Sequence, residues 1–121
     1  MPNSIILARY LRARARWRLD CAGVDARQAA RSAIALLDAA SYLRDVPDDH
    51  PDILALEAAG CFRDGEFEPG AEGARLVRNW KLADEAPGDP RELLAALAAT
   101  AGVPVLPRYG REFRRGRVGA R

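Results

Sequence analysis

The chain of 121 residues is poor in histidine and cysteine, and both shortages limit its chemistry. His50 is the only histidine, and no Ser or Cys near it in the sequence implies a third group that would orient it for nucleophilic catalysis. Two isolated cysteines, Cys21 and Cys61, are too few for a disulfide framework in so small a chain and have no C-x-x-C spacing. We therefore expect a non-catalytic, cytoplasmic protein that needs no cofactor and no metal.

Long apolar runs are also missing. No stretch approaches the roughly 18 apolar residues of a membrane span, and the run 4–8 is too short for the core of a signal peptide. We therefore expect no membrane association. Leu, Ile, Val and Phe make up only 27 of the 121 residues, whereas alanine alone contributes 24. This composition is typical of a single small domain, rich in helix-forming residues and with few large side chains in its core.

The apolar periodicity predicts an all-α domain of four or five helices within residues 1–102. Gly23 ends the first helix, and Asp25 followed by Gln28 has the spacing of a capping box for the second. Pro51 and Pro90 suit the first position of later helices. The short link after the first helix predicts an antiparallel helix pair at the N-terminus. The expected helices span residues 4–19, 25–45, 51–60, 71–83 and 90–101.

The first two helices have the clearest patterns. On the first, capped by Ser4, we expect an inward face opposite the basic residues Arg9, Arg12 and Arg16. The expected inward residues of this helix are Ile6, Tyr10, Ala13 and Trp17. Those of the second helix are Ala29, Ala33, Leu36, Leu37, Ala40 and Leu43.

Between the third and fourth helices, Asp64-Gly65 lies between Phe62 and Phe67. This is the signal of a very short hairpin, and we expect its aromatic residues to close one end of the helical core.

The last nineteen residues, 103–121, differ from the rest of the chain. Pro104 and Pro107 prevent a continuous helix, so this segment should run as an extended basic arm. Residues 1–20 carry five Arg against one Asp, and residues 108–121 carry six Arg against one Glu. The middle, 21–107, has 8 basic and 15 acidic residues. Basic ends therefore flank an acidic body.

The arm is too apolar for a free tail, and this is the basis of our main functional hypothesis. We expect it to lie across a neighbouring surface, as in a symmetric homodimer, where its apolar residues are buried and its arginines meet acidic side chains. The sequence thus predicts an interaction or assembly protein that self-associates through this arm. The expected partner contacts are Val105, Leu106, Tyr109 and Phe113.

Nucleic-acid binding is the alternative. All basic residues except Lys81 are arginines, which bind phosphate in a bidentate manner, although a GC-rich coding genome produces the same bias. A helix-turn-helix arrangement is disfavoured because the link 61–70 is much longer than the turn of that motif. The candidate phosphate contacts are Arg9, Arg12, Arg16, Arg75, Arg78, Arg111, Arg114, Arg115 and Arg117.

One cluster has the residue types of a metal site: Asp48, Asp49, His50 and Asp52. Adjacent donors rarely converge on one ion without ligands from elsewhere, whereas Asp49 or His50 is well placed to cap the helix that begins at Pro51. We therefore interpret the cluster as a helix cap.

Overall fold

The computed structural model describes residues 1–20, 25–82 and 88–102. Within these ranges the chain is mostly helical, as its periodicity predicts, with one short hairpin. The elements are α1 (Asn3–Asp20), α2 (Ala26–Leu43), α3 (Pro51–Ala58), β1 (Phe62–Arg63), β2 (Glu66–Phe67), α4 (Ala71–Asn79) and α5 (Pro90–Gly102). The predicted arm, 103–121, and Cys21 lie outside the described residues. Among those described, no helix is both long enough and apolar enough to cross a bilayer.

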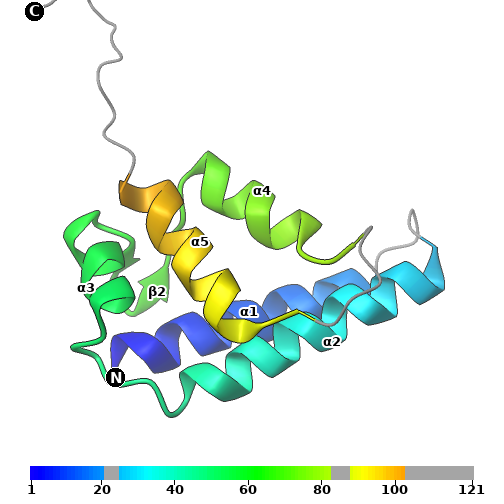
Figure 1. Ribbon diagram of the computed structural model, residues 1–121, viewed down its shortest axis with the longest axis horizontal. Helices are drawn as coiled ribbons and strands as arrows, with labels where there is room; N and C mark the ends of the chain where they lie inside the picture. The colour runs from blue at the N-terminus through cyan, green and yellow to red at the C-terminus, as the bar shows by residue number, and fades with distance from the viewer. Residues whose placement is uncertain (21–24, 83–87, 103–121) are drawn as a thin grey trace, which may run out of the picture.

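Helices α1 and α2 form the base of the molecule, lying side by side and antiparallel (Figure 1). Alanines on both helices are buried, namely Ala8 and Ala15 on α1 and Ala33 and Ala40 on α2. Such small side chains let two helix backbones approach closely. Helices α4 and α5 lie over this pair, and α3 packs against α5 at one end (Figure 1).

The predicted caps of α2 and α3 are confirmed. The side chain of Asp25 accepts hydrogen bonds from the N–H groups of Arg27 and Gln28. His50 Nδ1 accepts one from the N–H of Asp52, with Pro51 in the first helical position. These signals are short-range, so the sequence alone reveals them.

The predicted cap of α1 is wrong. The helix begins at Asn3, and Ser4 is buried inside it. The Asp48 carboxylate instead accepts hydrogen bonds from the N–H groups of Asn3 and Ser4, each at 3.1 Å. The antiparallel pairing returns the chain after α2 to the start of α1, so the cap comes from a residue 44 positions away.

The predicted inward face of α1 is also wrong in part. Ile6 is buried, but Ala13 is exposed and the Trp17 side chain is 49% exposed. The face that packs inward carries Leu7, Leu11, Ala15 and Arg18. Helix α1 has apolar residues on two adjacent faces, and contact with α2 and α4 selects the one with leucines at successive turns.

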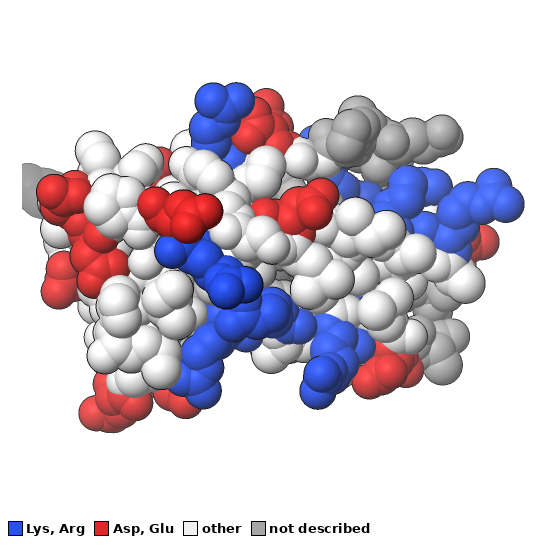
Figure 2. Space-filling model, turned by 90° about the horizontal axis from the view of Figure 1, so that it is seen from below, with Lys and Arg blue, Asp and Glu red and all other residues white. Residues whose placement is uncertain are grey.

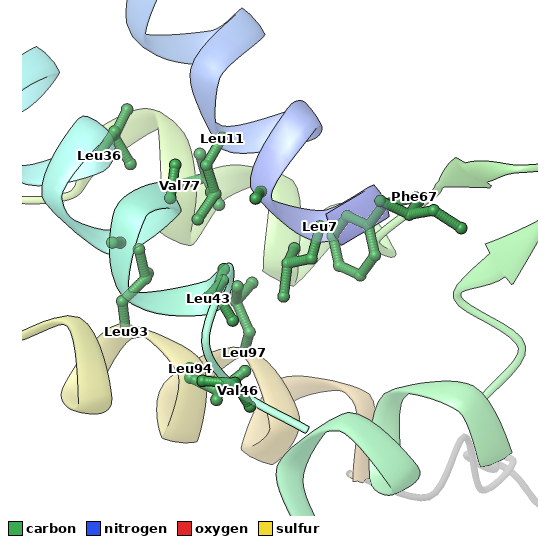
Figure 3. Packing of buried hydrophobic residues seen from close by; sticks show 14 of the residues in the cluster. Leu7, Leu11, Leu36, Leu43, Val46, Phe67, Val77, Leu93, Leu94 and Leu97 are labelled. Carbon is green, nitrogen blue, oxygen red and sulfur yellow. The ribbon is translucent and has the colours of Figure 1, made fainter. Parts of the chain in front are cut away.

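Leucines from several helices fill the centre of the core. Leu7, Leu43 and Leu97 converge there from α1, α2 and α5 (Figure 3), and all three are almost completely buried. On α2, Leu36 is buried as predicted, whereas Leu37 is 40% exposed.

The hairpin closes one end of this core, as predicted. Its two turn residues, Asp64 and Gly65, have φ of 54° and 77°, the left-handed values that a type I′ turn requires. Phe67 is buried, with its ring centroid 5.0 Å from that of Tyr10 and 5.3 Å from that of Phe62. The tight turn thus holds an aromatic plug against α1.

Candidate interaction surfaces

Three of the predicted phosphate contacts form an exposed stripe on α1. Arg9, Arg12 and Arg16 are all exposed. Figure 2 shows a band of basic side chains across the face that α1 and α2 form together. Arg9 is nine residues from Arg18, which faces α4, and nine residues are about two and a half helical turns. The stripe therefore faces away from α4.

The other two predicted phosphate contacts within the described residues, Arg75 and Arg78, are exposed on α4. Arg75 forms an ion pair with Glu72, at 2.7 Å between Nη1 and Oε1. Because the stripe on α1 points away from α4, the structure does not bring the two sets together on one surface. The remaining candidates, Arg111, Arg114, Arg115 and Arg117, lie outside the described residues.

A groove of about 580 Å³ lies between the hairpin, the start of α4 and the end of α5. Much of its lining is apolar, including Phe67, Pro69, Leu97 and Ala101. Ala101 lies two residues before Val103, so the groove is adjacent to the point where the predicted arm leaves the helical domain. The predicted partner contacts themselves, Val105, Leu106, Tyr109 and Phe113, lie outside the described residues.

Two further features define the edges of this groove. The Cys61 thiol lines it, and burial raises the pKa of that thiol from its ordinary value. A cleft of similar volume shares Glu72 and Thr100 with the groove and extends along α4 to Trp80. The surface between α4 and α5 is therefore hollowed over much of its length.

Arg18 is a feature that the sequence analysis missed. The residue is only 4% exposed, and its Nη2 donates a hydrogen bond to the carbonyl oxygen of Arg78 near the end of α4. Its Nε is buried and has no hydrogen-bond partner. The signal was its spacing, because Arg18 follows Leu11 by seven residues and Ala15 by three and so shares their face. A cavity of about 200 Å³ adjoins Arg18.

The residues with the composition of a metal site have structural roles. Asp48 caps α1, and His50 caps α3. In the described part of the chain, no group of three or more His, Cys, Asp or Glu residues is placed to hold a metal ion.

Comparison with known proteins identifies no relative: no family model, no curated protein and no solved structure matches the chain. The functional argument therefore depends on these surfaces alone.

Proposed function

We propose that the protein is a non-catalytic interaction protein that assembles into a homodimer through its C-terminal arm, residues 103–121. The observation that carries this proposal is the apolar groove next to the end of α5. The arm begins beside that groove with the sequence Val103-Pro104-Val105-Leu106-Pro107, which is apolar and cannot be helical throughout. An apolar segment of this kind lowers its free energy by leaving water for an apolar groove.

A second copy of the chain supplies the groove more readily than the same copy does. Ala101 lines the groove, and only a few residues separate it from Val105 and Leu106. An arm that entered its own groove would have to reverse direction within those residues, and Pro104 and Pro107 favour an extended course. In a two-fold dimer each arm can instead enter the groove of the other copy.

Charge supports the same arrangement. The arm carries six Arg against one Glu over residues 108–121, and Glu68 and Glu72 line the groove. Both carboxylates belong to exposed ion pairs within the domain, and such pairs are weak and readily exchanged. Incoming arginines would therefore find acidic partners beside the apolar lining.

Light scattering on the full chain tests the proposal. We expect the wild type to have the mass of a dimer and the double variant Val105→Asp/Leu106→Asp to have that of a monomer. Val118→Asp, which adds a charge to the same arm outside the predicted contacts, is the control and should remain dimeric. A double variant with the same mass as the wild type contradicts the proposal.

Nucleic-acid binding is the second candidate, and the exposed stripe on α1 favours it. If Arg9, Arg12 and Arg16 contact phosphates, fluorescence anisotropy should show binding to DNA or RNA that weakens steeply with salt. Replacing all three with Ala should lower the salt dependence by nearly one unit of slope per lost contact to a duplex. Arg75→Ala is the control, because Arg75 is paired with Glu72 on another surface. An absence of binding at low salt eliminates this candidate.

A further inference from the structure

The buried guanidinium of Arg18 has a donor that nothing in the described structure satisfies. Its Nη2 reaches the carbonyl oxygen of Arg78, which gives the residue a structural role near the end of α4. That bond accounts for one edge of the guanidinium and leaves the Nε–H buried without an acceptor. Burying a charge is costly unless it is paired and hydrogen-bonded, so this arrangement needs an anion to complete it.

The cavity beside Arg18 contains further positive charge. Arg14 and Arg78 line it together with Arg18, and its other walls include Trp17, Leu36 and Val77. Among the described residues that line it, none is an Asp or a Glu. Three guanidinium groups therefore border one small cavity with no carboxylate in its lining.

Aromatic rings hold two of these arginines in place. The guanidinium carbon of Arg18 lies 5.8 Å from the centre of the Trp17 ring, and that of Arg14 lies 5.5 Å from the centre of the Tyr10 ring. Cation–π contacts at these distances restrict the side chains without neutralising them. The guanidinium groups are thus oriented in advance, which reduces the entropy lost when a ligand binds.

We propose that the cavity lined by Arg14, Arg18 and Arg78 is a binding site for a phosphate group. A phosphate monoester carries nearly two negative charges and several acceptor oxygens, and so matches a set of cations better than a single carboxylate does. The cavity, at about 200 Å³, is smaller than the roughly 300–1,000 Å³ of pockets for drug-sized ligands. It therefore accepts the phosphate and a small part of the molecule that carries it. This site is independent of the arm-mediated dimer.

The experiment follows the Arg Nε–H signals of the full chain by NMR during three titrations. The probes are inorganic phosphate, a nucleoside 5′-monophosphate and a short single-stranded DNA, each at low ionic strength. We expect a saturable shift of the Arg18 Nε–H signal with at least one of them. A response to inorganic phosphate identifies the free ion as sufficient. A response to the monophosphate alone shows that the attached nucleoside is needed, and a response to DNA alone assigns the site to a nucleic-acid backbone.

Variants at the cavity mouth test the assignment without disturbing the core. Arg14 and Arg78 are exposed, so Arg14→Ala/Arg78→Ala should fold and should bind the responding probe at least tenfold more weakly. Arg9→Ala/Arg75→Ala removes the same charge elsewhere on α1 and α4 and should bind as the wild type does. Acetate serves as the carboxylate comparison and should bind at least fivefold more weakly. The proposal is overturned if no probe shifts the Arg18 signal by 20 mM, if the cavity double variant binds normally, or if acetate binds as tightly as phosphate.

Arg18→Met provides a second measurement. It removes the buried charge and keeps a flexible chain of similar shape, so the phosphate-free protein should melt at the same temperature as the wild type or higher. The responding probe should raise the melting temperature of the wild type and leave that of the variant unchanged. An equal rise in both proteins counts against the site.

Discussion

The cap that Asp48 provides for α1 is the interaction whose loss we can predict in most detail. Its two carboxylate oxygens accept hydrogen bonds from the N–H groups of Asn3 and Ser4, at the start of an 18-residue helix. Those N–H groups have no partner within the helix, and the negative charge also interacts favourably with the helix dipole. Asp48→Ala removes both contributions.

The size of the effect follows from these contributions. Loss of an N-terminal cap costs about 1 kcal/mol, and loss of a charge near the helix start costs roughly 0.3–1 kcal/mol. We therefore expect Asp48→Ala to lower the free energy of unfolding by about 1–2 kcal/mol. The connection between the end of α2 and the start of α1 should loosen, so hydrogen exchange should accelerate most at the first amides of α1.

Urea unfolding followed by circular dichroism measures the change. Asp49→Ala is the matched control, because Asp49 is the exposed neighbour of Asp48 and carries the same charge. Asp48→Asn, which keeps an acceptor and loses the charge, should lie between the two. Equal stabilities of the Asp48→Ala and Asp49→Ala variants would refute the proposed cap.

Three further predictions concern the hairpin turn, the buried thiol and the start of α5. Gly65→Ala should cost about 1 kcal/mol because Gly65 has a φ of 77°; Gly70→Ala, at ordinary φ and with the same open space, should be neutral, and equal effects in urea unfolding would contradict the conformational argument. In a Cys21→Ser background, iodoacetamide at pH 8 should alkylate Cys61 at least tenfold more slowly in the native chain than in urea, because burial raises the pKa of its thiol; equal rates would show that the thiol is accessible. Asp89 accepts hydrogen bonds from the guanidinium and the backbone N–H two residues on, which lower the pKa of its carboxyl. A lowered pKa stabilises the fold above about pH 4 and ceases to do so as the pH falls further, so Asp89→Ala should destabilise the chain at pH 7 and match the wild type in strong acid; a difference independent of pH would argue against this carboxylate as the source.

The apolar groove and the phosphate site show how unevenly function could be predicted from the sequence. The sequence marked the arm as apolar and basic, but the groove beside it is assembled from the hairpin, α4 and α5, and no local pattern indicates that these meet. Arg78 was among the predicted phosphate contacts, but its companions Arg14 and Arg18 were not. An arginine-rich helix contains many equivalent cations, and only packing determines which of them is buried.

The sequence by itself determined where most helices begin and how the hairpin turns. Asp25, His50 and Pro51 act on backbone groups within a few residues of themselves, and Asp64-Gly65 adopts left-handed dihedral angles that few other pairs tolerate. These effects are local, so they do not depend on what lies elsewhere in the chain.

The tertiary structure alone decided which face of α1 is buried and what caps its first turn. Leu7 and Leu11 compete with Tyr10 and Trp17 for the interior, and periodicity cannot rank two apolar faces on one helix. The antiparallel pairing with α2 resolves that choice and brings Asp48 to the start of α1. Burial and long-range hydrogen bonds depend on which surfaces meet, and this is settled only when the helices pack.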